Sequence, residues 1–440
     1  MLTPRRSFLT GGAAGLIAAA APGAAFAAGG LAPDSQADQS AAFAAALAAA
    51  ARAGKPLLLG PGRYRLAEVA LPDGAAVLGI AGQTRLVAAK GGVPLLRASG
   101  AGSIRLEGLV LDGASQALDD KSGLVMLESV ASLHLRDCAF VQSPAKGLVL
   151  QACGGRIEAS RFSALETAIY ANDSTGLTIT GNEVVDCTNN GILVHRSAKG
   201  FDGSIVSGNR IAHIGAVGGG LGWYGNGINV YRAGQVLVSG NSLTDCAFTF
   251  IRANSGDGVQ IIANNGRQCG ETGIYCEFSF EGAVIGQNMI EGAANGIAVV
   301  NFDKGGRLAA VTGNVVRNAF RRKLLDAEGE GYGTGIAIEA DTAASGNVVE
   351  LCPTSGFALG YGNFLRDVAL TGNVIRQCGA GVQVTVAKAA GNALISANVF
   401  SGCADGAVVG YEWEKKTTGD LAASGATAFP GITIGGNSII

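Results

Sequence analysis

The chain has 440 residues, a formal net charge of −2 and only 15% charged residues. This near-neutral balance gives no electrostatic reason to expect a nucleic acid or an anionic lipid surface as a partner. Length alone would allow two or three domains. Glycine, valine, isoleucine and asparagine nevertheless recur at short intervals to the last residue, which favours one continuous repeat architecture.

The first residues have the pattern of an export signal and not of a folded segment. Arg5 and Arg6 precede an apolar stretch that begins at Phe8 and Leu9, and small residues near position 27 provide a cleavage site. Glycines and a proline interrupt the stretch, whereas a spanning helix needs about 20 mostly apolar residues, so a membrane anchor is the weaker interpretation. Paired arginines before Phe-Leu indicate the twin-arginine route. We therefore expect a signal peptide over residues 1–27, the twin-arginine export machinery as a partner, and a periplasmic or secreted protein without a membrane span.

Residues 28–80 are expected to form an N-terminal capping α-helix and the first strands. Asp38 is a good N-cap and Gly54 is a good helix stop, so the predicted amphipathic helix runs through Leu47 to Arg52. A stack of repeats leaves its first coil uncovered, so this helix is predicted to close that end.

Residues 81–440 carry a repeated motif, apolar-x-apolar-x-Gly-Asn, which is followed by Gly-Ile-x-Val. It is clearest in residues 177–182 with residues 191–194. Its asparagines recur mostly every 23 to 27 residues: Asn182, Asn209, Asn241, Asn264, Asn288, Asn314, Asn347, Asn373, Asn398 and Asn437. Short period-2 strands at this spacing predict the stacked coils of an all-β, right-handed parallel β-helix, a solenoid. We expect the asparagines to occupy left-handed corners and to hydrogen-bond to one another along the stack.

The nine cysteines follow the same repeat. In an exported chain they would normally indicate disulfides, but the number is odd and folded export leaves thiols reduced during folding. Six of them lie five residues after a ladder asparagine: Cys187, Cys246, Cys269, Cys352, Cys378 and Cys403. The spacing predicts one inward column of small buried residues and not a metal site.

Two segments resemble a known superfamily. The helix followed by Leu57-Leu-Leu-Gly-Pro-Gly-Arg-Tyr64 resembles the opening segment of pectate-lyase-like proteins, and the Gly-Asn coils resemble their repeats. With the leader included, the chain resembles the twin-arginine-translocated uncharacterised repeat proteins. The resemblance implies the fold and export but no particular reaction. The motifs Asn-Thr-Asp, His-Gly and Arg-Ile-Lys of polygalacturonases and Asp-Pro-His of alginate-type epimerases are missing.

In such β-helices, the outer face of the sheet built from the Gly-Ile-x-Val strands usually binds polysaccharide. Strand alternation directs the two x positions outward, from Val125 and Leu127 at one end to Val408 and Gly410 at the other. The ends of this stripe are small, apolar or uncharged. Four consecutive central coils instead carry polar and aromatic residues: His195, Asn229, Tyr231, Arg252, Asn254, Tyr275 and Glu277.

Two long coils carry their extra residues just before these strands. The insertions are 215–226, with Trp223 and Tyr224, and 320–334, which is rich in charge. Both are expected to project beside the same face, four coils or roughly 19 Å apart. Long loops on a rigid repeat are a common place for binding sites.

The candidate site residues fall into two groups. We assign His195, Tyr231, Tyr275 and Glu277 as candidate catalytic residues, and Asn229, Arg252, Asn254, Trp223, Tyr224 and Glu339 as candidate substrate-binding residues. In a uronide lyase, Arg252 would pair with the sugar carboxylate, a base among His195, Tyr231 and Tyr275 would take the α-proton, and Glu277 would orient or donate.

The alternative is a non-catalytic glycan-binding or cell-envelope structural protein that uses the same groove. Each residue also has an ordinary explanation, such as a surface ion pair between Arg252 and Glu277 or loop packing by Trp223 and Tyr224. No metal-ligand cluster and no cofactor motif is recognisable, so any cofactor stays unknown.

The export signal provides the first test. Changing Arg5 and Arg6 together to lysine should leave unprocessed precursor in the cytoplasm, because the paired arginines are the feature that this route reads. Cell fractionation and immunoblotting measure the outcome. Normal processing of the double variant would show that another route exports the protein.

Overall fold

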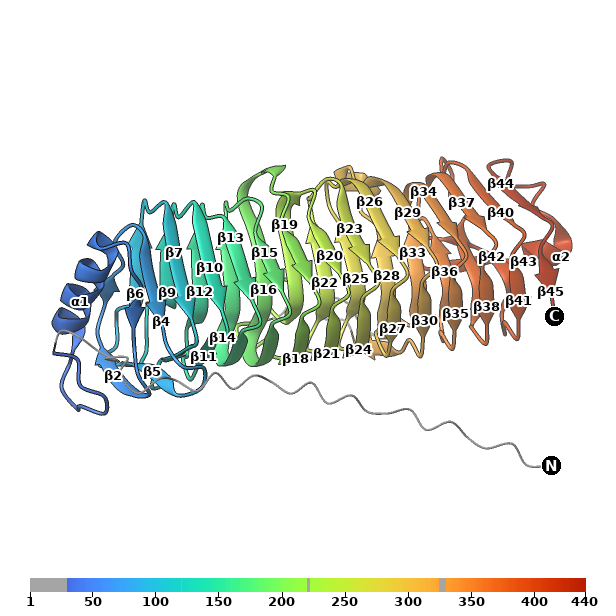
Figure 1. The fold of residues 1–440 in the computed structure, drawn as a ribbon. Coiled ribbons are helices and arrows are strands. Elements are labelled where there is room, and N and C mark those ends of the chain that lie inside the picture. The colour runs from blue at the N-terminus through green and yellow to red at the C-terminus, as the bar shows by residue number, and fades with distance from the viewer. Residues whose placement is uncertain (1–29, 120, 220–221, 324–329) are drawn as a thin grey trace, which may run out of the picture.

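The protein is a right-handed parallel β-helix, described here by a computed structural model that covers residues 30–119, 121–219, 222–323 and 330–440. One elongated stack of coils runs from the helix α1 (Ser40–Arg52) at the N-terminal end to α2 (Leu421–Ser424) at the other, as Figure 1 shows. The predicted export signal, with Arg5 and Arg6, lies outside the described residues.

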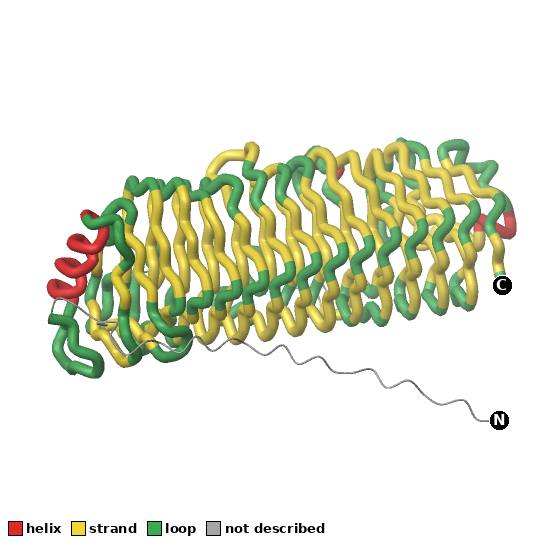
Figure 2. Tube along the Cα trace, viewed as in Figure 1, coloured by secondary structure: helices red, strands yellow, loops and turns green. Residues whose placement is uncertain are grey.

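Each coil contributes strands to three parallel faces, and the tube in Figure 2 shows these strands stacked in columns with loops at the corners. The first face is a 15-stranded parallel sheet. Its strands are β1 (Leu57–Leu58), β4 (Ala75–Leu78), β7 (Ser103–Glu107), β10 (Ser132–Arg136), β13 (Gly155–Glu158), β15 (Thr178–Thr180), β17 (Ile205–Ser207), β20 (Leu237–Ser239), β23 (Val259–Ile262), β26 (Glu281–Gly286), β29 (Arg307–Thr312), β34 (Ala340–Ser345), β37 (Arg366–Thr371), β40 (Ala393–Ser396) and β44 (Ile432–Gly435).

The second face follows the asparagine corner and is made of short strands. They are β2 (Gly62–Leu66), β5 (Thr84–Ala88), β8 (Leu109–Asp112), β11 (Ala139–Val141), the first parts of β14 (Arg161–Asn172) and β16 (Glu183–Phe201), β18 (Arg210–Ile214), β21 (Ser242–Cys246), β24 (Asn265–Cys269), β27 (Met289–Glu291), β30 (Val315–Arg317), β35 (Val348–Glu350), β38 (Val374–Arg376), β41 (Val399–Ser401) and β45 (Ser438–Ile439).

The third face carries the Gly-Ile-x-Val strands. They are β3 (Val69–Ala70), β6 (Leu96–Ser99), β9 (Gly123–Glu128), β12 (Lys146–Gln151), the second parts of β14 and β16, β19 (Asn226–Gly234), β22 (Thr249–Asn254), β25 (Thr272–Glu277), β28 (Asn295–Val299), β33 (Thr334–Ile338), β36 (Ser355–Leu359), β39 (Ala380–Thr385) and β42 (Gly406–Glu412). Two antiparallel hairpins leave this face: β31 (Arg321–Lys323) with β32 (Glu330–Tyr332), and β42 with β43 (Lys415–Asp420).

The core is one continuous apolar column, because every coil sends side chains inward from all three faces. Phe140 and Phe162 on successive coils stack with ring centroids 4.6 Å apart, which follows from parallel pairing in register. Helix α1 closes the first coil with Phe43 and Leu47, both fully buried, which agrees with the predicted cap. Its N-cap is Gln39, and Asp38 lies one residue earlier and accepts the Ser40 N–H. Among the described residues, no helix combines the length and the apolar composition needed to cross a membrane.

The asparagine ladder is confirmed over its whole predicted length. At each step the Oδ1 of one asparagine accepts both the backbone N–H and the Nδ2–H of the asparagine before it, as between Asn288 and Asn314 at 3.0 Å. Each Nδ2 also donates to a backbone carbonyl of the preceding coil, such as Ile285 O for Asn314. Both ends of each amide are therefore satisfied, all ladder side chains except the half-buried Asn437 are buried, and together they connect the coils along the full stack.

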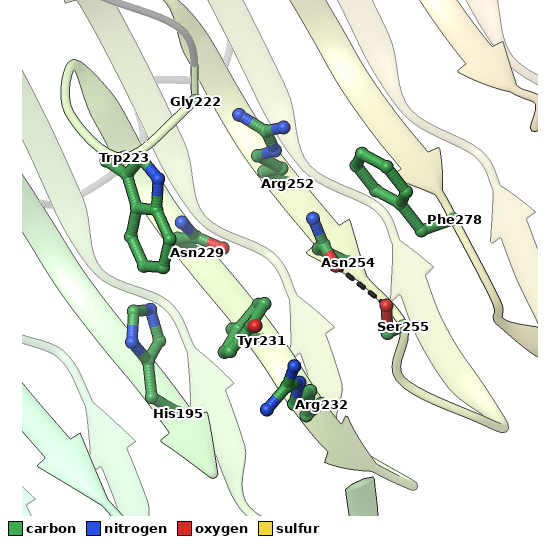
Figure 3. Close-up of a pocket in the computed structure, with 10 residues that line it drawn as sticks. All are labelled: His195, Gly222, Trp223, Asn229, Tyr231, Arg232, Arg252, Asn254, Ser255 and Phe278. Atoms are coloured by element: carbon green, nitrogen blue, oxygen red, sulfur yellow. Dashed lines mark hydrogen bonds between the residues drawn. The ribbon is translucent and has the colours of Figure 1, made fainter. Parts of the chain in front are cut away.

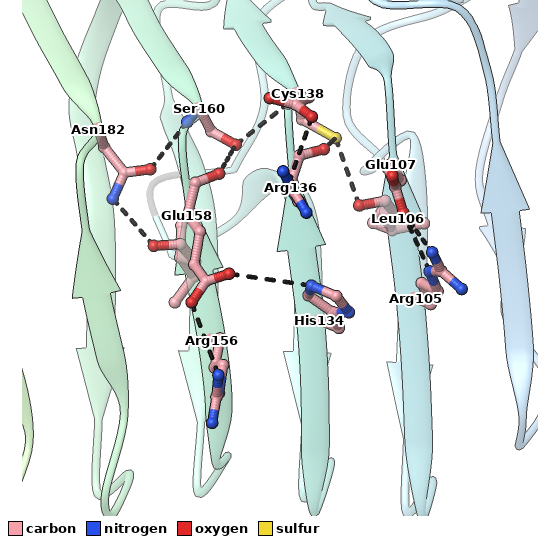
Figure 4. A network of polar contacts seen from close by, with 12 residues as sticks. Arg105, Leu106, Glu107, His134, Arg136, Cys138, Arg156, Glu158, Ser160 and Asn182 are labelled. Carbon is pink, nitrogen blue, oxygen red and sulfur yellow. Dashed lines mark hydrogen bonds and ion pairs between the residues drawn. The ribbon is translucent and has the colours of Figure 1, made fainter. Parts of the chain in front are cut away.

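Other residues continue this ladder before its first asparagine. The Ser160 N–H donates to Asn182 Oδ1, and the Cys138 N–H donates to Ser160 Oγ, as Figure 4 shows. The weaker early coils thus use serine and cysteine at the ladder position. On the outer surface beside them, ion pairs such as the Arg105–Glu107 contact cover the first face.

One detail of the corner differs from the prediction. The left-handed residue is the one before the asparagine and not the asparagine itself: Gly181 has φ +63°, and Ala263, Gln287 and Ala397 occupy the same position at +55 to +57°. A glycine adopts this conformation without the cost of a Cβ atom. The asparagine keeps an ordinary backbone, which directs its side chain into the stack.

The structure confirms that the cysteine column points inward. All nine cysteines are free, and each is buried except the half-buried Cys403. Cys187, Ile214, Cys246 and Cys269 follow one another in register on successive coils, so cysteine and isoleucine share one inward position of the repeat. Burial raises the pKa of the Cys187 thiol to about 12, which keeps it neutral and unreactive.

The ladder predicts an unequal cost of removing its members. Asn314→Ala should lower the free energy of unfolding by about 3 kcal/mol or more, because it leaves several buried polar groups unpaired at about 1–3 kcal/mol each. Asn437→Ala, at the half-buried last position, should cost clearly less since water replaces the lost contacts. Denaturant titrations of both variants measure this, and equal losses would contradict a cooperative buried ladder.

Candidate functional site

The polar stripe predicted on the third face is present. Successive coils place Tyr170, Leu193, Asn229, Arg252 and Tyr275 in one outward row, in register from strand to strand. A second outward row, two residues further along each strand, holds Asn172, His195, Tyr231, Asn254 and Glu277. Parallel pairing in register is what turns a sequence period into these two straight rows.

The register predicted at both ends of the stripe is wrong by one residue. Val125 and Leu127 are fully buried, and Met126 pairs with Val149 in the outward row. At the other end Val409 pairs with Gln383, so Val408 points inward. A one-residue shift exchanges the two faces of a strand, and the apolar ends of the stripe offered no polar residue to reveal it. The central rows are unaffected.

A chain of rings runs along the centre of this face. His195 lies edge-on to Tyr170, with ring centroids 5.5 Å apart, and 5.5 Å from Tyr231 on its other side. Trp223 of the first insertion reaches the same cluster, 5.8 Å from Tyr231. Trp223 remains 61% exposed, so the cluster leaves a large aromatic surface open to a ligand.

These rings border a pocket of about 320 Å³, which we call the proximal pocket (Figure 3). Its floor is formed by outward residues of β16, β19 and β22, and Figure 3 shows Trp223 on the loop that crosses its upper edge. The lining residues are His195, Gly222, Trp223, Asn229, Tyr231, Arg232, Arg252, Asn254, Ser255 and Phe278. Of the ten candidate residues predicted from the sequence, the structure brings together six here: His195, Trp223, Asn229, Tyr231, Arg252 and Asn254.

Two buried polar atoms of the pocket-lining residues have no hydrogen-bond partner in the part of the chain that the structure describes. They are Nε2 of His195, which is 7% exposed, and Oδ1 of Asn229, which is 4% exposed. Burial lowers the pKa of His195 to about 4, so the ring is neutral at physiological pH. Buried polar atoms are nearly always paired, so these two are exceptions among the residues that line the pocket.

Arg252 is not the free cation that the sequence allowed. Its guanidinium forms an ion pair with Glu277, and both side chains are buried, at 13% and 3% exposure. The cation also lies 5.4 Å from the Tyr275 ring centroid, under Gly222, where an added Cβ would collide with the guanidinium. Asn254 donates to the same Glu277 oxygen at 2.9 Å. Arg252 thus lines the pocket with its side chain fixed in place and its positive charge neutralised by Glu277.

Tyr275 and Glu277, two of the predicted catalytic residues, do not line the proximal pocket. Burial, followed by the nearby Glu277, raises the pKa of Tyr275, so its hydroxyl stays protonated. Burial also raises the pKa of Glu277, opposed by the Arg252 charge and by hydrogen bonds. Sequence reasoning missed Glu271, which is close enough to interact with Arg252 and Arg322 and whose pKa burial likewise raises.

The far edge of the pocket is made by residues that strand alternation did not identify. Arg232, Ser255 and Phe278 directly follow the second outward row on three successive coils, and all three are left-handed, with φ of 57 to 58°. In a regular strand the residue after an outward one would point inward. The left-handed backbone interrupts this alternation, so the side chains of these three residues lie on the pocket side. Arg232 stacks over Tyr231 at 4.8 Å and donates to Ser197 O at 2.8 Å. Among the described residues, no carboxylate forms an ion pair with it.

Both insertions lie beside the third face as predicted, but the second reaches further than expected. Arg322 lies over the Phe248 ring at 5.6 Å and donates to Gly270 O, and the Phe248 N–H donates to Gly225 O of the first insertion at 2.9 Å. Both insertions therefore contact Phe248, so they are not separated by an open gap of about 19 Å. A guanidinium stacks well on an aromatic face, which explains the contact.

Two further candidates lie away from the pocket. Tyr224 packs against Gly218 within its own loop, which is the loop-packing alternative. Glu339 accepts the Phe302 N–H at 2.7 Å and so holds the turn at η1 (Phe302–Lys304). Burial raises the pKa of Glu339 to about 7. The described residues contain no group of three or more His, Cys, Asp and Glu side chains placed to hold a metal ion.

Comparison with known proteins agrees with this architecture. The family model for the right-handed β-helix region matches residues 106–222 and 146–316. The chain has the right-handed β-helix fold, and the matched residues form its central coils. No curated protein matches the sequence. The resemblance to the twin-arginine-translocated repeat proteins stays a prediction, because the matching model describes only the coil repeat.

Among solved structures, the catalytic unit of the thermostable GH87 α-1,3-glucanase from Streptomyces thermodiastaticus strain HF3-3 has a TM-score of 0.51 at 13% identity, over 93% of this β-helix chain and 67% of its own. The A-module of the Azotobacter vinelandii mannuronan C-5 epimerase AlgE6 has a TM-score of 0.45 at 16% identity, over 93% and 97%. The Dettilon tailspike protein has a TM-score of 0.44 at 16% identity, over 84% and 66%. The TM-score of the glucanase indicates a shared fold, and an identity of 13% does not indicate a shared activity.

The state of His195 makes stability depend on pH. Its folded pKa of about 4 lies below the ordinary histidine pKa of 6.5, so the unfolded chain binds more protons between these values. Stability from this group is complete above about pH 6.5 and is lost as the pH falls toward 4. In His195→Phe, the decrease in the free energy of unfolding between neutral and acid pH should be smaller by up to about 3 kcal/mol, since one pKa unit is worth about 1.4 kcal/mol. Denaturant titrations of both proteins at about pH 7.5 and about pH 4.5 measure the difference; parallel losses would mean that His195 is not buried as described.

Proposed function

We propose that this β-helix protein binds a polysaccharide chain in the proximal pocket, and that it prefers a glycan with uronate sugars. The observation that carries the proposal is the pair of buried, unpartnered polar atoms, His195 Nε2 and Asn229 Oδ1, at the base of an open aromatic pocket. Sugar hydroxyls both donate and accept, so they match one donor-or-acceptor nitrogen and one amide oxygen.

The aromatic residues supply the second element of recognition. Trp223, Tyr231 and the 39% exposed Phe278 border the pocket, and the C–H faces of a sugar ring can cover such surfaces. The rows run along the stack from β16 to β25, which spans roughly 14 Å at about 4.8 Å per coil. An extended chain of sugars fits a groove of this shape better than a compact small molecule does.

Arg232 supports the preference for an acidic glycan. It is the arginine at the pocket edge that has no carboxylate partner among the described residues, whereas Arg252 is neutralised by Glu277. Its planar guanidinium can hold a sugar carboxylate through two hydrogen bonds. The sequence assigned the pairing with the sugar carboxylate to Arg252. We now assign it to Arg232, on the opposite edge of the pocket (Figure 3).

Catalysis by a uronide lyase is the second candidate. His195 would take the α-proton of the uronate, the bond to the neighbouring sugar oxygen would break, and the Tyr231 hydroxyl would return a proton to that oxygen. The neutral ring and unpartnered nitrogen of His195 favour this reading. A pKa of about 4 nevertheless makes the ring a weak base at neutral pH, where a general base works best with a pKa near the working pH. Binding is therefore the function that the geometry supports best.

The fold and the predicted leader provide context for this function. The glucanase with the same fold acts on a polysaccharide, which makes polysaccharides the first ligand class to test. Export by the twin-arginine route would bring the pocket to the periplasm or the cell exterior, where such polymers are found.

The test is a binding panel of polygalacturonate, alginate and α-1,3-glucan, with calorimetry on wild type and single variants. Arg232→Gln should weaken binding to the uronan by about 10-fold or more, since a hydrogen bond to a charged group is worth about 1.5–3 kcal/mol. Arg366→Gln is the control away from the pocket: Arg366 also stacks on a ring, that of Phe302, but it extends from β37 on the first face, where it pairs with Asp341.

The outcomes separate the candidates. Equal affinity of wild type and Arg232→Gln for a uronan would remove the acidic preference. Unsaturated uronide products formed by wild type, but not by His195→Asn, would favour the lyase over the binding protein. Arg252→Ala is unsuitable for this purpose, since it leaves Glu277 buried and unpaired and should destabilise the fold by about 3–5 kcal/mol.

A further inference from the structure

A second pocket of about 580 Å³, which we call the distal pocket, lies on the third face. Its floor continues the same two outward rows. Gln383, which pairs in register with Ala358, belongs to the first row, and Tyr411, which pairs with Thr385, belongs to the second. The β31–β32 hairpin stands between the two pockets: Arg322 reaches back to Gly270, while Arg321 donates forward to Thr354 at 3.0 Å. The β42–β43 hairpin forms the far wall.

The indole of Trp413 is held as a platform in this pocket. Its ring lies on the backbone of Gly362, where an added Cβ would come within 2.4 Å of the indole. Tyr361 and Phe364 meet it edge-on, with ring centroids 5.2 and 6.3 Å away. The contacts fix the ring, yet 51% of Trp413 and 45% of Tyr361 remain exposed.

The backbone conformation of Trp413 is energetically unfavourable. Glu412 pairs with Lys415, so Trp413 and Glu414 form a two-residue hairpin turn. Trp413 has φ +56°. In such turns the residue with positive φ is usually glycine or asparagine, and a bulky residue there is uncommon and unfavourable. Residues held in unfavourable conformations cluster at functional sites, and here the effect is to present an indole beside a pocket.

The polar groups around this platform differ from those of the proximal pocket. Among the described residues, none hydrogen-bonds to the amide of Gln383, which can both donate and accept. Glu330 and Glu414 line the pocket, and Glu414 accepts from the Tyr361 hydroxyl at 3.4 Å. Carboxylates accept hydrogen bonds from sugar hydroxyls but repel a uronate. Arg321 also lines the pocket and donates to Pro353 O as well as to Thr354.

We propose that the distal pocket is a second saccharide site, which binds an uncharged sugar ring on Trp413 with Gln383 and Glu414 as hydrogen-bonding partners. The site is separate from the proximal pocket and does not depend on what that pocket binds. Five coil steps separate Arg252 from Gln383 along the outward row, or roughly 24 Å at about 4.8 Å per coil.

The test uses the two tryptophans of the chain, Trp223 and Trp413, because one lies in each pocket. In Trp223→Phe, Trp413 is the sole indole and its fluorescence reports the distal pocket. In Trp413→Phe, Trp223 reports the proximal pocket. The probes are oligosaccharides of α-1,3-glucan, β-1,4-glucan and β-1,4-mannan as uncharged ligands, and those of alginate and polygalacturonate as acidic ligands.

We expect at least one uncharged probe to change the Trp413 emission and to bind about 10-fold or more tightly than either acidic probe. Glu414→Gln should narrow that difference, since it removes the charge and keeps the size of the side chain. Tyr361→Ala, which removes an edge contact of the indole, should weaken binding, whereas Tyr361→Phe should keep most of it.

Two results would overturn the proposal: no response of Trp413 to any uncharged probe, or acidic probes that bind the distal pocket as well as the uncharged ones. The response of Trp223 is read separately. Silence of Trp223 toward both uronans, with a response of Trp413, would contradict the proximal function and leave the distal site standing.

Discussion

The hydrogen bonds between stacked asparagine side chains are the constraint on which this molecule depends. Each one ties a buried corner of a coil to the next corner, with both the amide oxygen and the amide nitrogen paired. Because a buried amide without partners is costly, these residues allow one alignment of neighbouring coils. The strands on all three faces then follow in register, since a shift at the corner would misplace every inward side chain.

This alignment is also what creates binding surfaces. A residue type that recurs at one position of the repeat becomes a straight row, as cysteine does inside and as the polar stripe does on the third face. Rigid rows cost little entropy when a ligand binds, because the strands already hold the side chains. The proposed polysaccharide ligand is a linear polymer, which matches such a surface because the open aromatic groups of the third face are arranged along the stack.

The charged residues divide that surface into two chemically different pockets. The proximal pocket has Arg232 at its edge and a neutralised Arg252–Glu277 pair in its wall. The distal pocket has Glu330 and Glu414 around an indole platform. Between them, the β31–β32 hairpin contacts both neighbours through Arg321 and Arg322. One face of a simple repeat thus presents two different sets of recognition groups, and the insertions separate them.

Much of this architecture could be predicted from the sequence, because a position within the coil is a local property. The spacing of the asparagines and of the cysteines identified the stack, the corners and the inward column, and alternation identified the central rows with His195, Asn229 and Tyr231. Contacts between coils could not be predicted in the same way. Glu277 neutralises Arg252 from the next coil, and Arg322 reaches Phe248 across several coils. Left-handed residues at the strand ends place Arg232 and Phe278 at the pocket, where alternation gives no information. The sequence by itself determined which residues face outward on the central coils, where polar side chains mark the outer face. Only the tertiary structure fixed the register at the two ends and decided which outward residues meet, because that depends on coil length, corner conformation and the reach of long side chains.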